Sequence, residues 1–147
     1  MDKSLLDTDT LSEILKGKNL NIICQANNYY QKWGQYTIST ITVLEIIKGF
    51  HKVQRESHIE QFLSTLSNTE ILTLNLKSAE LAGRIYADLE RTGQPIGRAD
   101  PMIAAIALEN NLVLVTGNLR HYQRIQKLGY SLKLDNWKIE KTQPSAD

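Results

Sequence analysis

Cysteine is almost absent from this sequence, since Cys24 is the only one. A single cysteine excludes an internal disulfide and a zinc site built from several thiolates, and this composition is typical of a reducing compartment. Cys24 directly follows Ile22 and Ile23. We therefore expect it to be a small residue of the apolar core.

Long apolar runs are missing as well. No stretch approaches the roughly 18 apolar residues that a membrane span requires, and Asp2, Asp7 and Asp9 interrupt the only apolar run near the N-terminus. This pattern does not fit a signal peptide, which needs an uninterrupted apolar segment behind basic residues. The sequence therefore predicts a soluble cytoplasmic protein without membrane contact.

Net charge is also close to zero, because 17 basic residues are balanced by 16 acidic ones. Binding to nucleic acid would therefore depend on local basic patches rather than on overall charge. Apolar residues make up 41% of the chain, which is enough for a packed core. We predict one domain over residues 1–137, followed by a C-terminal tail over residues 138–147.

Short apolar segments alternate with longer segments of helical periodicity. Strands are expected at residues 5–6, 36–39, 71–74, 112–116 and 131–134. Helices are expected at residues 10–17, 21–32, 42–49, 51–66, 77–91, 98–110 and 119–128. The helix at 98–110 is apolar enough to be buried on both faces. The alternation predicts an α/β fold, a three-layer α/β/α sandwich with a mostly parallel central sheet.

Four polar residues fall where these strands and helices meet. Asp7 follows the first strand and Asn118 follows the fourth, while Glu45 lies in the helix after the second strand. Asp100 opens the helix before the fourth strand. Because the carboxyl ends of parallel strands share one edge of a sheet, we expect the four residues to converge there. Clustered carboxylates suit a hard divalent cation such as Mg²⁺ or Mn²⁺, so the pattern predicts metal-assisted hydrolysis of a phosphoester.

The first of these residues also fits a purely structural role. Asp7 could cap the helix that follows it, although Asp9 and a capping box at Thr10–Glu13 already suit that helix start. We therefore interpret Asp7 as the residue that faces a metal ion and Asp9 as a residue of the helix start.

The other three residues have structural explanations too. Glu45 completes a second capping box with Thr42, a role that does not exclude metal contact. Asp100 could be stabilised by the helix dipole alone, and Asn118 is a natural N-cap for the helix after it. Spacing by itself leaves both kinds of explanation open.

Four segments in order carry a family resemblance: Leu5–Ser12, Ile38–Gly49, Gly93–Ala105 and Leu114–Tyr122. Together they resemble PIN-domain ribonucleases, specifically the VapC-type toxins of bacterial toxin–antitoxin modules. The resemblance implies an endoribonuclease that depends on Mg²⁺ or Mn²⁺. It also implies an RNA substrate, a cognate antitoxin protein, and assembly as a homodimer or as a toxin–antitoxin hetero-oligomer.

The same resemblance implies roles for individual residues. The metal ligands of the family fall on Asp7, Glu45 and Asp100, and its fourth catalytic position falls on Asn118. Asn118 adds no negative charge, so one metal ion held mainly by Asp7 and Asp100 is expected rather than a strict pair of ions.

Basic residues near these segments are candidates for contact with RNA. Lys48, Arg98 and Arg120 are the best placed, although each could equally be a solvated surface charge. For His121 we expect a surface or packing role.

Two other functions fit parts of the sequence. A PIN fold could be a catalytically idle binding module, although the intact Asp7, Glu45 and Asp100 weigh against that. Residues Asp7–Thr10 also resemble the nucleophile loop of haloacid-dehalogenase-type phosphatases. Leu11 stands where that motif requires Thr or Val, and no later Gly-Asp-x-x-x-Asp run supplies its other acids.

Overall fold

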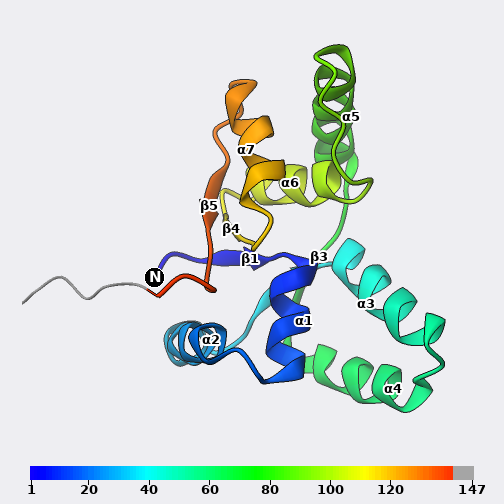
Figure 1. Ribbon diagram of the computed structural model, residues 1–147, viewed down its shortest axis with the longest axis vertical. Helices are drawn as coiled ribbons and strands as arrows, with labels where there is room; N and C mark the ends of the chain where they lie inside the picture. Colours follow the sequence, from blue (N-terminus) through cyan, green and yellow to red (C-terminus); the bar gives the residue numbers. More distant parts are fainter. Residues whose placement is uncertain (141–147) are drawn as a thin grey trace, which may run out of the picture.

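The computed structural model describes residues 1–140 (Figure 1). The strands are β1 Ser4–Leu6, β2 Thr37–Ser39, β3 Glu70–Leu72, β4 Val113–Val115 and β5 Lys133–Asp135. The helices are α1 Thr8–Lys16, α2 Leu20–Trp33, α3 Thr40–Lys52, α4 Glu56–Thr65, the 3₁₀ helix η1 Leu66–Asn68, α5 Leu76–Arg91, α6 Asp100–Glu109 and α7 Leu119–Lys127. Each predicted element is present, with ends that differ by a few residues.

All strand pairs among the described residues are parallel. β4 lies between β1 and β5, with Leu5 opposite Leu114 and Leu114 opposite Leu134. β2 and β3 form a separate hydrogen-bonded pair, in which Ile38 lies opposite Ile71. Because β2 packs beside β1, the strands form one layer, although its hydrogen bonds divide the predicted single sheet into two parts.

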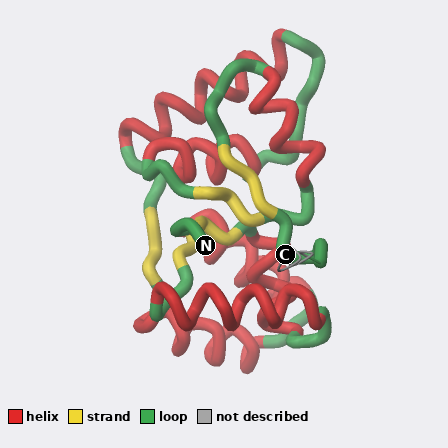
Figure 2. The backbone as a smooth tube through the Cα atoms, turned by 90° about the vertical axis from the view of Figure 1, so that its left-hand side faces the viewer, coloured by secondary structure: helices red, strands yellow, loops and turns green. Residues whose placement is uncertain are grey.

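Helices cover both faces of this strand layer, with α5, α6 and α7 on one face and α1 to α4 on the other (Figures 1 and 2). Leu5 and Leu114 pack with the first group, whereas the next residues of the same strands, Leu6 and Val115, pack with the second. Successive side chains of a strand point to opposite faces, so each strand supplies both cores. The three-layer sandwich is confirmed, and α6 is buried along Ile103–Ala107 as predicted.

Two helices begin earlier than predicted because they follow their strands without a connecting loop. Asp7 is the N-cap of α1, and Ser39 is the N-cap of α3, where its hydroxyl accepts a hydrogen bond from a backbone N–H at 3.1 Å. The expected capping boxes at Thr10–Glu13 and Thr42–Glu45 are therefore wrong. The predicted helix at 51–66 is also wrong at its start, since Gln54, at φ 58°, separates α3 from α4.

The prediction of a buried Cys24 is wrong as well. Helix α2 buries Ile22, Ala26 and Tyr29, which are spaced by four and three residues and so share one face. Cys24 is two positions from Ile22, on the opposite side of the helix, and is exposed. Its apolar neighbours in the sequence are not its neighbours on the helix surface.

No helix within residues 1–140 is long and apolar enough to cross a membrane. The boundary predicted between a domain at 1–137 and a tail at 138–147 stays a prediction. Residues 141–147 lie outside the described residues.

Candidate active site

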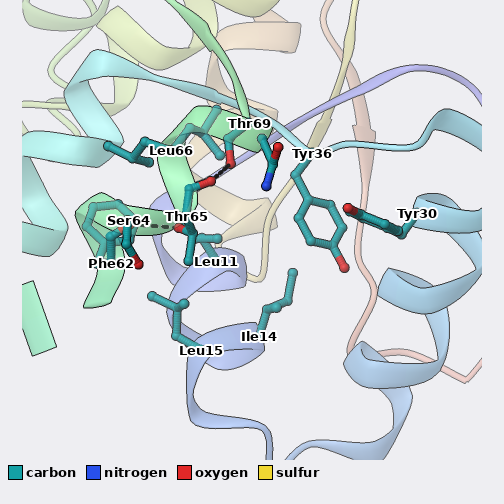
Figure 3. A pocket seen from close by; sticks show the side chains of 12 residues that line it. Leu11, Ile14, Leu15, Tyr30, Tyr36, Phe62, Ser64, Thr65, Leu66 and Thr69 are labelled. Carbon is teal, nitrogen blue, oxygen red and sulfur yellow. Dashed lines mark hydrogen bonds between the residues drawn. The ribbon is translucent and has the colours of Figure 1, made fainter. Parts of the chain in front are cut away.

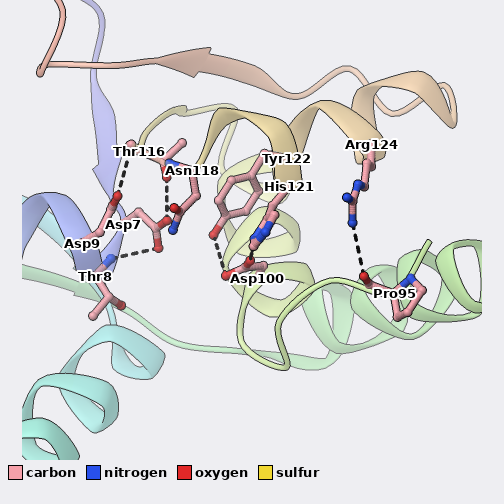
Figure 4. Close-up of polar contacts among 11 residues, drawn as sticks. Asp7, Thr8, Asp9, Pro95, Asp100, Thr116, Asn118, His121, Tyr122 and Arg124 are labelled. Carbon is pink, nitrogen blue, oxygen red and sulfur yellow. Dashed lines mark hydrogen bonds and ion pairs between the residues drawn. The ribbon is translucent and has the colours of Figure 1, made fainter.

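The carboxylate of Asp7 lies where β1 ends and α1 begins. Its Oδ1 accepts a hydrogen bond from the backbone N–H of Thr8 (2.9 Å), and its Oδ2 accepts one from the hydroxyl of Thr116 (2.8 Å) (Figure 4). Asp7 is only 3% exposed. Burial, followed by the negative charge of nearby Asp9, raises the pKa of Asp7 from 3.8 to about 7. Near neutral pH, this buried carboxylate is stabilised by a proton or by a cation beside it.

Glu45 reaches the same edge of the strand layer from the second turn of α3. The hydroxyl of Thr8 donates a hydrogen bond to Glu45 Oε1 at 2.6 Å and lies 3.1 Å from the hydroxyl of Thr42. Thr8 therefore connects two of the predicted site residues, because its N–H binds Asp7 and its hydroxyl binds Glu45.

Asp100, at the start of α6, is held by two neighbouring side chains of α7. His121 Nδ1 lies 3.1 Å from Asp100 Oδ2, and the Tyr122 hydroxyl donates to Asp100 Oδ1 at 3.3 Å (Figure 4). Burial, and then the carboxylates of Asp7 and Asp100, raise the pKa of Tyr122 well above its usual value, so its hydroxyl remains a donor. Tyr122 thus lies close to both acids. His121 is partly at the surface, as expected from a surface or packing role, but it also contacts Asp100, which was not predicted.

Asn118 stands at the N-cap position of α7, but its side chain makes no capping hydrogen bond. Its backbone N–H instead donates to the Thr116 hydroxyl oxygen (3.0 Å), which itself donates to Asp7. The side chain of Asn118 is exposed. The N-cap explanation is therefore correct for the place of Asn118 and wrong for its side chain.

Thr116 and Asp9 complete this edge. Thr116 was predicted to lie at the end of the fourth strand but was given no role in the site. Its only signal is its place as the first polar residue after the apolar strand β4. Asp9 does not act as the residue that starts α1, because Asp7 has that place and the Asp9 carboxylate accepts a hydrogen bond from Gly117 N–H at 2.8 Å. We call this region, formed by Asp7, Asp9, Glu45, Asp100 and their partners, the acidic edge.

The side chains of the acidic edge fit a hard cation in their chemistry. All its predicted ligands are carboxylates, and oxygen ligands are those that Mg²⁺ and Mn²⁺ prefer. The charges of Asp9 and Asp100 both disfavour the ionised form of Asp7, and a bound cation would reverse that effect. Within residues 1–140, however, no three Asp, Glu, His or Cys side chains are grouped closely enough to hold one ion. Metal binding at this edge would therefore require its side chains to draw together.

The predicted RNA contacts lie on the surface. Lys48, Arg98 and Arg120 are exposed. Within the described part of the chain, none of their side chains forms a hydrogen bond or ion pair. Arg124 differs, because it donates to the backbone oxygen of Pro95 at 3.3 Å and so ties α7 to the loop that precedes Asp100 (Figure 4).

A large concavity lies away from these acids. It has a volume of about 360 Å³ and is lined by α1, α4, β2 and neighbouring segments (Figure 3). Its walls include Leu11, Ile14, Leu15, Phe62 and Leu66. We call it the apolar groove. No Asp, Glu, Lys, Arg or His lines it, so it offers no acid–base or metal chemistry, and the candidate active site is the acidic edge.

Comparison with known proteins agrees with this arrangement. The family model of the PIN domain matches residues 4–128. The chain belongs to the PIN-domain family. The predicted resemblance is thereby confirmed, and the haloacid-dehalogenase alternative is not favoured.

Named PIN-domain relatives cover almost the whole chain. "Ribonuclease VapC2" of Haemophilus influenzae is 36% identical over 141 residues, which are 93% of this chain and 99% of the relative. The "tRNA(fMet)-specific endonuclease VapC" of Salmonella typhimurium is 33% identical over 138 residues, again 93% of this chain and 99% of the relative. Both relatives are of the VapC type.

Solved structures agree with these relatives. The crystal structure of DNA-bound VapBC from Salmonella typhimurium contains a chain with a TM-score of 0.78 and 33% identity, covering 93% of this chain and 99% of that one. The structure of VapBC2 from Rickettsia felis bound to a promoter DNA fragment gives a TM-score of 0.76 at 27% identity, with 91% and 98% covered. The PIN fold of this chain is therefore that of VapC proteins.

Proposed function

We propose that this PIN-domain protein is an endoribonuclease that depends on Mg²⁺ or Mn²⁺ and is the toxin of a toxin–antitoxin pair in the cytoplasm. The observation that carries the proposal is the buried carboxylate of Asp7, which is linked by hydrogen bonds through Thr8 to Glu45. Asp7 also lies beside Tyr122, whose hydroxyl donates a hydrogen bond to Asp100. The relatives named ribonuclease and endonuclease VapC support it.

The residues of the acidic edge have distinct proposed roles. Asp7 and Asp100 would hold the metal ion, and Glu45 would hold it or orient the attacking water. Asn118, whose side chain is exposed and makes no capping bond, would donate a hydrogen bond to a phosphate oxygen or to water. A bound divalent ion supplies an activated water and neutralises charge on the phosphate.

The protein would bind its RNA substrate through the phosphate groups of the RNA. Lys48, Arg98 and Arg120 are exposed cations without a partner among residues 1–140, and such side chains bind phosphate without reading sequence. One relative is named as specific for tRNA(fMet), so transfer RNA belongs among the substrates to be tested.

The test of activity is cleavage of total RNA by the purified protein with Mn²⁺, followed by mapping of the new ends. Discrete cuts by the wild type and none by Asp7→Ala are expected, with Lys133→Ala, at an exposed residue of β5, as a surface control. Cleavage by Asp7→Ala at the wild-type rate would overturn the proposal. If neither protein cuts RNA and Mn²⁺ binds both equally, the protein is an idle binding module.

The proposed partner is a cognate antitoxin, in a toxin–antitoxin hetero-oligomer that can include a homodimer of this chain. Similar solved structures are of VapBC, which supports this proposal. The test is co-expression with the product of the neighbouring reading frame. A complex that survives purification and has lost RNA cleavage is expected, whereas separate elution of the two proteins with cleavage intact would contradict it.

A further inference from the structure

Asp9 lies two residues after Asp7, but its carboxylate binds a different part of the chain. Asp9 Oδ2 accepts a hydrogen bond from the backbone N–H of Gly117 at 2.8 Å. Asp9 belongs to the first turn of α1, and Gly117 belongs to the loop between β4 and α7. This bond therefore joins segments that are 108 residues apart in the sequence.

The lack of a side chain at Gly117 leaves room for the Asp9 carboxylate. A Cβ atom added to Gly117 would lie 2.7 Å from Asp9 Oδ2 and 3.2 Å from Lys138 Nζ, so any side chain at this position would force the Asp9 carboxylate to shift. Gly117 is not among the glycines with positive φ. Its backbone conformation is thus open to other residues, so close approach of the Asp9 carboxylate explains the glycine.

The loop that Asp9 holds carries two groups of the acidic edge. Thr116 precedes Gly117 and donates its hydroxyl to Asp7 Oδ2 at 2.8 Å. Asn118 follows Gly117 and donates its N–H to the Thr116 hydroxyl oxygen at 3.0 Å. A shift of Gly117 would therefore move the partner of Asp7 and the side chain of Asn118 together.

Other bonds between α1 and β4 end before this loop. The N–H of Asp7 and the hydroxyl of Thr10 both donate to the backbone oxygen of Val115, at 2.9 and 3.2 Å. Beyond Thr116, the hydrogen bond that Gly117 N–H donates to Asp9 is the one hydrogen bond within residues 1–140 that joins the loop to α1. The side chain of Asn118 does not anchor the loop, because it makes no capping bond.

We propose that Asp9 is a positioning residue, which clamps the β4–α7 loop to α1 and thereby sets Thr116 on Asp7 and Asn118 at the acidic edge. The consequence for catalysis rests on the proposed ribonuclease function, whereas the clamp itself does not. Groups that act in catalysis must be held within about 0.5 Å of their productive positions, and a bond from a rigid helix to a loop meets that need.

The first test compares two substitutions of Asp9 in Mn²⁺-dependent RNA cleavage. Both substitutions remove the charge of Asp9, but only Asp9→Asn keeps an oxygen that can accept the Gly117 N–H. The kcat of Asp9→Ala should therefore be about tenfold lower than that of Asp9→Asn, with little difference in KM. An equal loss in Asp9→Asn and Asp9→Ala would assign the effect to charge and overturn the clamp. Wild-type kcat in Asp9→Ala would overturn it as well.

Gly117→Ala provides a second variant. It should lower kcat by about tenfold when Asp9 is present, because the added methyl group meets the carboxylate, and by much less in Asp9→Ala, where the crowding oxygen is gone. Independent, multiplicative losses in the double variant would contradict a direct contact between these residues.

The second test does not depend on cleavage. Hydrogen exchange of the Gly117 amide, measured by NMR on the folded protein, should be slow in wild type and Asp9→Asn and about tenfold faster in Asp9→Ala. Equal exchange rates in all three proteins would refute the clamp. If the wild type cuts no RNA, the proposed function fails, and the exchange rates still decide whether Asp9 holds the loop.

Discussion

Helix α1 contributes to two regions of opposite character. Its first turn supplies Thr8 and Asp9 to the acidic edge, and its apolar side supplies Leu11 and Ile14 to the apolar groove. The acidic edge is a set of partly buried charges joined by hydrogen bonds. The groove is a hollow of about 360 Å³, yet no charged residue lines it. The size of a cavity and the chemistry of a site are therefore separate properties, and burial of charge indicates the site.

The two regions also differ in what they contribute to stability. Apolar groups such as Phe62, 3% exposed, stabilise the fold in proportion to the area that they bury. Asp7 has the opposite effect near neutral pH, because on folding its carboxylate must take up a proton or remain charged in an apolar setting. Removing the buried carboxylate of Asp7 should therefore lower activity without lowering stability. Replacing a buried residue of the groove such as Phe62 should lower stability more than activity.

The largest expected effect on activity comes from Asp100. Asp100→Ala removes a proposed metal ligand and should lower kcat/KM for RNA cleavage by about a hundredfold to a thousandfold, as losing several kcal/mol of charge stabilisation would. Asp100→Asn should lose nearly as much, because its amide is a poorer metal ligand. Initial-rate measurements on a purified RNA check this, and near-normal rates in both variants would remove Asp100 from the site.

The next effect concerns stability and pH. The pKa of Asp7 is about 7 in the folded protein and 3.8 in the unfolded chain, so the folded state binds the proton more tightly. This group therefore contributes stability below about pH 4 that is lost as the pH rises through about 7. Without metal, Asp7→Asn should be more stable than wild type by a few kcal/mol at about pH 8, with the difference vanishing toward about pH 4.

Urea unfolding in the presence of a chelator measures this difference. A gap between the two proteins that stays constant across the pH range would contradict the raised pKa of Asp7. Asp135→Asn, at the end of β5, is a matched control for the loss of one carboxylate.

A smaller effect is expected for Thr116→Val, which keeps the shape of the side chain but removes the hydroxyl that binds Asp7 and receives the N–H of Asn118. We expect kcat to fall by about tenfold, the effect of one lost hydrogen bond to a charged group. Thr116→Ser retains the hydroxyl and should recover most of the rate. Equal rates in the Val and Ser variants would show that the hydroxyl has no part in catalysis.

The smallest effect is expected at the groove. Leu15, which lines it and is 42% exposed, can be changed to Gln with little loss of buried area. RNA cleavage should stay within about twofold of wild type, and the free energy of unfolding within about 0.5 kcal/mol. A loss of cleavage as large as that of Thr116→Val would show that the groove also contributes to RNA cleavage and would contradict the assignment of activity to the acidic edge alone.

The sequence predicted the layers of the fold and the acids of the site for the same reason. Strand and helix periodicities are local, and they place Asp7, Glu45 and Asp100 at strand or helix ends that a parallel fold brings to one edge. Contacts between distant segments could not be predicted in this way. The bonds from Thr116 to Asp7, from Gly117 to Asp9 and from His121 to Asp100 depend on how α1, α6 and α7 pack.

Local errors have physical causes too. Asp7 and Ser39 directly follow or end their strands and also cap the next helices. Both helices therefore begin earlier in the sequence than predicted, and the expected capping boxes lie inside them. Cys24 has apolar neighbours along the chain but lies on the outer side of α2, because one face of a helix repeats every three or four residues.

We propose that the ionised form of Asp7 needs a cation beside it and that the acidic edge provides the site. Calorimetric titration of Mn²⁺ into the metal-free protein at about pH 8, where the Asp7 carboxyl is ionised in the absence of metal, tests it most directly. We predict saturable binding to the wild type and affinity at least about tenfold weaker in Asp7→Asn, since the amide lacks the charge of the carboxylate. Equal affinity in the two proteins would contradict the claim.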